Sequence, residues 1–205
     1  MLNFKGGHIY KCSNDDYGGG ISCFEFSQLN MTGGRISECE AQRGAGIFLD
    51  NSSGSTSISG GIIEKCHASQ YGGGICACSV GDFFNLYGGT ICKNSCEGSD
   101  GISGAGIAIL EKANISEANG QEINIYGNTC TNYQYGSGIF AAPYDGTIQL
   151  ISGDVYGNDG SGVFVVYDPD CENDITVINP AKFKIHDNYL GGTFDEATGC
   201  YVAND

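Results

Sequence analysis

The sequence predicts an all-β protein, a right-handed single-stranded parallel β-helix of about seven coils with three short strands each. Two observations predict it: a glycine-rich phrase recurs along the chain, and no segment keeps helical periodicity over a useful length. The composition agrees, with 34 Gly but 3 Pro in 205 residues. Sharp corners tolerate glycine, whereas proline would remove a ladder hydrogen bond from every coil. We expect one domain over residues 1–205.

The first half of the repeat is a Gly pair, one residue, an Ile, two residues and then Cys or Asn, as in Gly60 to Cys66. Its apolar anchors recur at intervals of 27, 27, 28, 34, 30 and 30 residues, at Ile9, Ile36, Ile63, Ile91, Ile125, Val155 and Ile185. Stacked at about 4.8 Å between coils, the anchors predict one continuous inward column. An inward amide ladder is expected at the next corner, formed by Asn94, Asn128, Asn158 and Asn188.

The second half of the repeat is a Gly-x-Gly-Ile or Gly-x-Gly-Val phrase. Its copies begin at Gly18, Gly44, Gly72, Gly104, Gly136 and Gly160, with a degenerate seventh copy at Gly199. A third apolar patch lies five and seven residues before each anchor. An insertion around Ala113 to Gln121 is expected to put the fifth unit out of register.

These two phrases resemble the repeats of the polymorphic outer-membrane proteins, bacterial surface adhesins whose exported passenger is a right-handed parallel β-helix of the pectate-lyase-like type. The resemblance runs from Gly6 to about Val202. It implies an extracellular or cell-surface location and an adhesive role. Fold likeness alone does not imply a function, because solenoids of many activities share such coils.

The net charge of −15 argues against a nucleic-acid partner or an anionic membrane, because phosphate groups need a basic face. The longest apolar run, Val163 to Tyr167, is far shorter than the ~18 residues of a membrane span, so no membrane insertion is expected. Cations and neutral polymers remain as partners.

Eleven cysteines leave at least one without an intramolecular disulfide partner. Cys96 and Cys130 share one column and are the preferred disulfide pair, since adjacent coils bring Cα atoms within the ~4.4–6.8 Å that a disulfide spans. Cys12 and Cys39 share a second column with Cys66, where reduced thiols packed as small hydrophobic groups are the alternative. Cys76-Ala77-Cys78 does not have zinc-site spacing.

Three sequons mark Asn30, Asn51 and Asn114 as candidate N-glycosylation sites. Together with the cysteines, they favour an oxidising, secretory context.

No catalytic residue is predicted, and the chain is not expected to be an enzyme. Residues 113–181 contain nine acids but neither Lys nor Arg, which argues against a polysaccharide lyase with a basic catalytic group there. A glycoside hydrolase is the alternative, because that reaction needs two suitably spaced carboxylates. The candidates are Asp145, Asp154, Asp159 and Asp168.

No cofactor is expected, with one possible exception. The acidic run at residues 168–174 offers Asp168, Asp170 and Asp174 as oxygen ligands for Ca²⁺, although it departs from the EF-hand pattern. A solvated loop is the alternative.

Two surfaces are candidates for partners. Phe48, Phe140, Phe164 and Tyr201 should point outward on one face, where a partner, a glycan or the chain's own loops would cover them. Neither end shows a cap, so we expect the ends to stack on the remainder of a longer solenoid or on a second copy, head to tail. The sequence therefore predicts an extracellular structural or adhesive solenoid, with a carbohydrate-active enzyme as the alternative.

Overall fold

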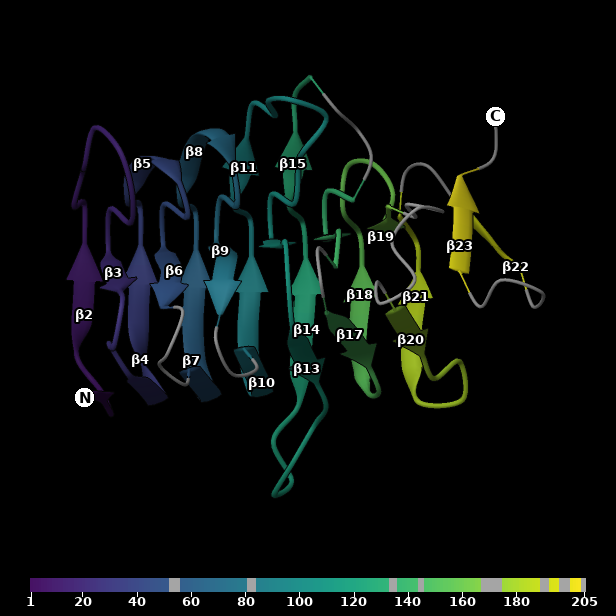
Figure 1. Cartoon of the computed structure of the whole chain (residues 1–205), viewed down its shortest axis with the longest axis horizontal. Coiled ribbons are helices and arrows are strands. Elements are labelled where there is room, and N and C mark those ends of the chain that lie inside the picture. The colour runs from purple at the N-terminus through teal and green to yellow at the C-terminus, as the bar shows by residue number, and fades with distance from the viewer. Residues whose placement is uncertain are drawn as a thin grey trace.

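The computed structural model is a parallel β-solenoid of about six turns (Figure 1). It describes residues 1–51, 56–80, 84–132, 136–143, 146–166, 175–188, 192–195 and 200–203. Three sheets of parallel strands run along the solenoid, and each coil contributes strands to them in turn. The all-β fold predicted from the repeat is confirmed.

The first sheet takes the strands that precede the Cys or Asn corner. Along one row they are β1 (Leu2–Phe4), β4 (Leu29–Ser37), β7 (Thr56–Glu64), β10 (Phe84–Cys92), β13 (Ala113–Ile115), β17 (Thr147–Leu150) and β20 (Ile175–Ile178). The same sheet also contains β2 (His8–Tyr10), β14 (Ile123–Tyr126), β18 (Gly153–Tyr156) and β21 (Phe183–His186). In the second to fourth coils the two predicted runs therefore join into one nine-residue strand.

Two further parallel sheets complete the coils. The second sheet consists of β5 (Glu40–Arg43), β8 (His67–Tyr71), β11 (Ser95–Cys96) and β15 (Thr129–Cys130). The third consists of β3 (Ile21–Phe24), β6 (Ile47–Asn51), β9 (Ile75–Val80), β12 (Ile107–Ile109), β16 (Ile139–Ala141) and β19 (Val163–Val165).

The seventh coil differs from the prediction. Its first two strands, β20 and β21, extend the first sheet, but the degenerate copy at Gly199 does not add a seventh strand to the third sheet. Instead β23 (Cys200–Ala203) pairs antiparallel with β22 (Gly192–Asp195). The expected count of seven is therefore corrected to about six turns.

The two glycines of the Gly-x-Gly-Ile phrase have different roles. Gly72 has a φ of 69°, in the left-handed region that side chains with a Cβ adopt at a cost. A Cβ on Gly74 would lie 2.5 Å from the carbonyl oxygen of Gly106, the equivalent glycine of the next coil. The first glycine therefore permits the turn, and the last permits the close stacking of coils.

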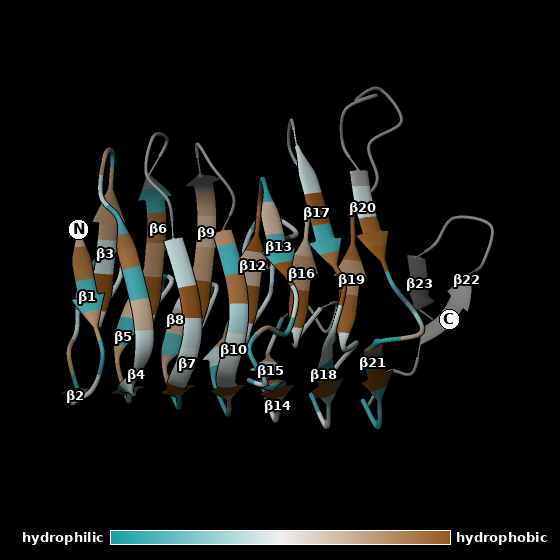
Figure 2. Cartoon of the chain, turned by 90° about the horizontal axis from the view of Figure 1, so that it is seen from below, coloured by the Kyte–Doolittle hydropathy of each residue, from teal (hydrophilic) through white to brown (hydrophobic). Residues whose placement is uncertain are grey.

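The anchor column fills the interior as predicted. Ile36, Ile63, Ile91, Ile125 and Val155 are each at most 1% exposed. They stack in register from coil to coil, and the third sheet adds its own inward column opposite. Figure 2 shows the resulting bands of hydrophobic and hydrophilic residues along the strands.

The amide ladder is also confirmed. The Asn94 side-chain nitrogen donates to Asn128 Oδ1 at 3.1 Å, and Asn128 donates in the same way to Asn158 at 2.9 Å. Asn158 in turn donates to Asn188 at 2.9 Å. The side-chain oxygens of Asn128, Asn158 and Asn188 also accept the backbone N–H of the asparagine one coil earlier. The ladder therefore joins coils through both main chain and side chain.

The insertion in the fifth coil is shorter than predicted. Ala113 and Ile115 form β13 and pair in register with Phe84 and Leu86, so they supply the members missing from the apolar columns. The extra residues lie between β13 and β14, in the loop that protrudes below the sheet in Figure 1. This insertion loop, residues 116–122, becomes one wall of a groove.

Candidate functional site

The outer face of the first sheet carries a grid of side chains on three successive coils. One row of the grid is Asn124, Asp154 and Lys184, and the other is Tyr126, Tyr156 and His186. The rows come from β14, β18 and β21, whose alternate residues point outward while the anchors between them point into the core. In-register stacking therefore places chemically different side chains from three coils in two straight rows, separated by the coil spacing.

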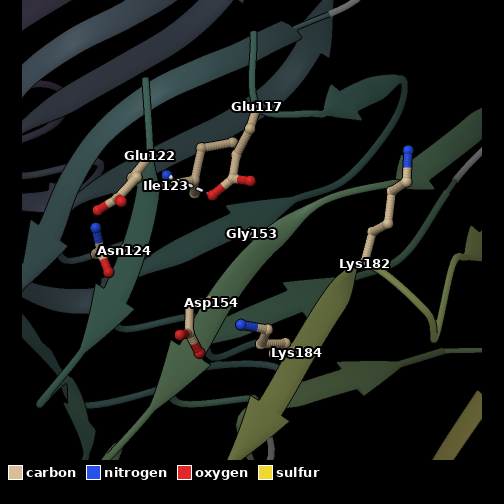
Figure 3. A pocket seen from close by; sticks show the side chains of 8 residues that line it. All are labelled: Glu117, Glu122, Ile123, Asn124, Gly153, Asp154, Lys182 and Lys184. Carbon is tan, nitrogen blue, oxygen red and sulfur yellow. Dashed lines mark hydrogen bonds between the residues drawn. The ribbon is translucent and has the colours of Figure 1, made fainter. Parts of the chain in front are cut away.

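The insertion loop turns this face into a groove of about 250 Å³. Its lining, drawn in Figure 3, comprises Glu117, Glu122, Ile123, Asn124, Gly153, Asp154, Lys182 and Lys184. Three acidic residues and two lysines thus line one hollow. A groove with this lining suits a ligand that has many hydroxyl or other polar groups.

The loop wall is held in place by two hydrogen bonds of Glu117. Its carboxylate accepts the backbone N–H of Ile123 at 3.1 Å, the contact drawn in Figure 3. Its own backbone N–H donates to the Ser152 hydroxyl at 2.7 Å. These bonds join Glu117, near the start of the loop, to the first residue of β14 and to Ser152, directly before β18.

Asp154 lies at the centre of the grid. His186 Nε2 is 2.8 Å from Asp154 Oδ1, and His186 Nδ1 is 2.8 Å from Asp187 Oδ2. The hydrogen bond to Asp187 and the negative charge of Asp154 raise the pKa of His186 above its usual 6.5. Figure 3 shows the Lys184 side chain directed toward Asp154, whereas Lys182 points away.

The second row of the grid is a stack of rings. The Tyr126 and Tyr156 centroids are 5.1 Å apart at an interplanar angle of 15°, and those of Tyr156 and His186 are 5.4 Å apart at 5°. The Cys92 thiol of the preceding coil hydrogen-bonds Tyr126 and raises the pKa of Tyr126 to about 12. Because the rings stack on one another, their edges rather than their faces are directed outward.

The carboxylates that sequence reasoning chose are mostly not the ones that the fold brings together. Asp154 is in the groove, but Asp159 lies at another corner, beside Thr129. Asp145 and Asp168 lie outside the described residues. The other two acidic residues of the groove are Glu117 and Glu122. The repeat pattern did not single them out, because they belong to the insertion.

The groove contains basic residues, contrary to the expectation drawn from residues 113–181. Asp154 pairs in register with Lys184, which is 30 residues later in the chain but directly adjacent in the sheet. Lys182 lines the same groove. The repeat could have located both lysines, because residues that are one repeat length apart in the sequence lie side by side in the sheet.

The expected disulfide between Cys96 and Cys130 is not formed, because both residues are thiols. They are register partners, as predicted, and both are buried. In-register stacking keeps the two Cβ atoms near the coil spacing of about 4.8 Å, longer than the ~3.8 Å typical of a disulfide. The hydrogen bond between the Cys96 and Cys130 thiols and the burial of Cys96 raise the pKa of Cys96.

Cys12 and Cys39 are also thiols, which supports the alternative reading of this column. The Cys39 and Cys66 thiols donate to the carbonyl oxygens of Ser37 and Glu64, each at 3.4 Å. A hydrogen bond from Cys66 lowers the pKa of Cys39 to about 6, and the same bond raises that of Cys66. The column thus continues the asparagine ladder with sulfur in place of the amide.

The predicted partner-facing aromatic row points outward, but most of it is covered by the chain itself. Phe48 and Phe140 are 3% and 1% exposed, within a second hydrophobic cluster on the outer face of the third sheet. Phe164 stacks on Phe140 with ring centroids 5.9 Å apart. Phe48 and Phe140 therefore cannot face a partner, and the Tyr201 side chain lies outside the described residues.

Two of the three sequons lie on β-strands of the first sheet. Asn30 and Asn114 belong to its outward polar row, and the Asn30 side chain donates to Asn3 Oδ1 at 3.2 Å. The side chain of Asn51 lies outside the described residues, as do Asp168, Asp170 and Asp174 of the proposed calcium loop. Within the residues that the structure does describe, no group of three or more His, Cys, Asp or Glu fits a metal site.

Comparison of the chain with protein-family models, curated proteins and solved structures gives no significant match. The fold and the groove are therefore interpreted from this chain's own residues. Among the described residues, no helix is long and apolar enough to cross a membrane.

Proposed function

We propose that the chain is an extracellular structural or adhesive β-solenoid that binds a neutral glycan along the groove of its first sheet. The observation that carries the proposal is the two-row grid on three coils, with ring centroids at intervals of 5.1 and 5.4 Å. A polymer lying along the solenoid axis would meet a similarly placed polar side chain on each coil.

The chemistry of the grid supports a sugar rather than an apolar ligand. Carboxylate, amide and ammonium groups from Asp154, Asn124 and Lys184 provide both acceptors and donors for hydroxyl groups. The edges of Tyr126 and Tyr156 add hydroxyl groups on an apolar body.

The charge of the chain supports a neutral polymer over an acidic one. Glu117, Glu122 and Asp154 outnumber the two lysines of the groove, and the whole chain carries a net charge of −15. A polyanion would be repelled by this field. An acidic glycan would need a bridging cation.

Affinity gel electrophoresis tests the proposal with soluble neutral glycans, such as a β-glucan, a galactan and a xyloglucan, and with polygalacturonate as the acidic comparison. Asp154→Asn should weaken retardation by at least one neutral glycan about tenfold, the effect of one lost charge-assisted hydrogen bond. Asp159→Asn is the matched control, since Asp159 is exposed at another corner. No retardation by any glycan, or equal behaviour of the two variants, would contradict the proposal.

The extracellular setting and the assembly are part of the same proposal. The resemblance to surface adhesins and the sequons at Asn30 and Asn114 support the location. The edge strand β1 supports stacking of a further coil, from a longer solenoid or from a second copy, because Leu2 is 46% exposed beside an open strand edge. Light scattering over a range of concentrations, with Leu2→Lys as the edge-blocking variant, measures self-association.

A carbohydrate-active enzyme of the glycoside hydrolase type is the second candidate. The observation that favours it is the presence of Glu117 and Glu122 in the same groove as Asp154. Two carboxylates facing one bound sugar are the requirement of that reaction. Release of reducing ends from a bound glycan, abolished by Asp154→Asn, would identify a hydrolase, whereas binding without product would leave the adhesive function.

A further inference from the structure

A pair of thiols lies outside the groove, on the outer face of the third sheet. Cys76 and Cys78 are both on β9, with their sulfur atoms 3.0 Å apart. Cys76 is fully buried and Cys78 is partly exposed. Cys78 is therefore the more accessible residue of the pair, and its sulfur is in contact with that of Cys76.

A β-bulge places the two sulfurs together. Strand β9 pairs Ala77 with Leu49 and Ser79 with Asp50, so Cys78 is the extra residue without a register partner on β6. Side chains two residues apart on a regular strand share a face but are separated by two residue rises, about 6.6 Å. The bulge bends the strand locally, which is how Cys78 comes to lie beside Cys76.

The surroundings of the pair include a fixed positive charge. The Arg43 guanidinium lies over the Tyr71 ring at 4.9 Å from its centroid, and its Nε donates to Gln70 at 2.6 Å. Burial and the neighbouring thiol raise the pKa of Cys76, and the charge of Arg43 partly opposes this effect. Burial prevails, so the guanidinium only partly offsets the cost of forming a thiolate at Cys76.

We propose that Cys76 and Cys78 form a redox-active dithiol site that is reversibly oxidised to a disulfide by small-molecule disulfides such as oxidised glutathione. The Cys78 thiolate attacks one sulfur of the reagent, forms a mixed disulfide and releases one equivalent of thiol. The Cys76 thiolate then attacks the Cys78 sulfur, and the second equivalent of thiol leaves. Two protein thiols are oxidised, one reagent disulfide is reduced to two thiols, and the two protons end on those thiols.

Cys76 and Cys78 differ from the other hydrogen-bonded thiol pairs because they lie on one strand, at a bulge, rather than on two adjacent coils. The Cys76 and Cys78 sulfurs need to approach from 3.0 Å to about 2.0 Å, within one β-bulge. An attacking group already in contact acts at a very high effective concentration, which offsets the raised pKa of Cys76. Cys96 and Cys130 belong to different coils, so their approach would require two coils to move together.

The test equilibrates the full chain in mixtures of reduced and oxidised glutathione, quenches it with acid, alkylates the free thiols and maps each cysteine by mass. A Cys76–Cys78 disulfide should accumulate at a lower fraction of oxidised glutathione than any bond between Cys96 and Cys130, the matched pair of buried neighbours. Cys76→Ala should leave a glutathione adduct trapped on Cys78. Cys78→Ala should leave Cys76 unmodified, because Cys76 is buried.

Circular dichroism is used to check that each variant keeps the β-sheet signal of the unchanged protein. If Cys76→Ala does not fold, Cys78→Ala, at a partly exposed position, provides the readout. The proposal is overturned if Cys76 and Cys78 stay fully alkylatable under conditions that oxidise Cys96 and Cys130. A stable glutathione adduct on Cys78 of the unchanged protein would overturn it as well, since Cys76 would then have failed to displace it.

Discussion

Removal of one rung of the asparagine ladder should destabilise the solenoid strongly. Asn128 is 0% exposed, and Asn128→Ala deletes four side-chain hydrogen bonds. The backbone N–H of Asn94 loses its acceptor, and the Ile91 carbonyl oxygen loses a donor. At about 0.5–1.5 kcal/mol for each bond, the free energy of unfolding should fall by about 2–6 kcal/mol.

Two further variants of the ladder separate hydrogen bonding from packing. Asn188→Ala removes contacts at the partly exposed end of the ladder, where water can replace them, so it should cost about 1 kcal/mol or less. Asn128→Cys should cost less than Asn128→Ala, because a thiol occupies the equivalent corner at Cys66 and donates there to a carbonyl.

Urea denaturation followed by circular dichroism measures all three variants. A loss below about 1 kcal/mol for Asn128→Ala, or a loss no larger than that of Asn188→Ala, would refute the reasoning. In that case the hydrogen bonds of the ladder would form when the coils stack but would not contribute to the free energy of unfolding.

Three other predictions test the corners, the groove and the outer cluster. Gly74→Ala should prevent close coil stacking and lower the unfolding midpoint in urea, whereas Gly6→Ala, where a Cβ meets nothing within 4 Å, should not. Because the pKa of His186 is raised in the folded state, its contribution to stability is present below its unfolded value of about 6.5 and is lost as the pH rises through the folded value. An NMR titration should show that raised value, and Asp154→Asn should lower it. Phe140→Ala should cost about 3–5 kcal/mol in urea denaturation, against a negligible cost if the cluster were an open partner site.

The groove shows why a repeat predicts a fold better than a site. The anchors and the ladder asparagines recur at nearly constant intervals, so one unit already indicates how the next will stack. Glu117 and Glu122 belong to no repeat, and their position depends on how the insertion loop folds back on β14 and β18. Lys184 is far from Asp154 along the chain but adjacent to it across the sheet, so a search for basic residues within one stretch of sequence misses it.

The cysteines show the same difference between what the repeat predicts and what it does not. The sequence placed Cys96 above Cys130 correctly, but column membership does not determine whether two sulfurs converge. Cys76 and Cys78 gave no such column signal, and their contact arises from a bulge that the spacing of the residues does not reveal. Small departures from regular strand geometry therefore determine which thiols can react with each other.

The sequence by itself determined the solenoid, the inward Ile column and the Asn ladder, because each is a local pattern repeated with the period of the coil. The tertiary structure alone decided the number of closed turns, the lining of the groove, the cover over Phe48 and Phe140, and the thiol pair. The physical reason is that stacking follows from equivalent residues one period apart, whereas grooves, covers and bulges arise where one coil differs from its neighbours.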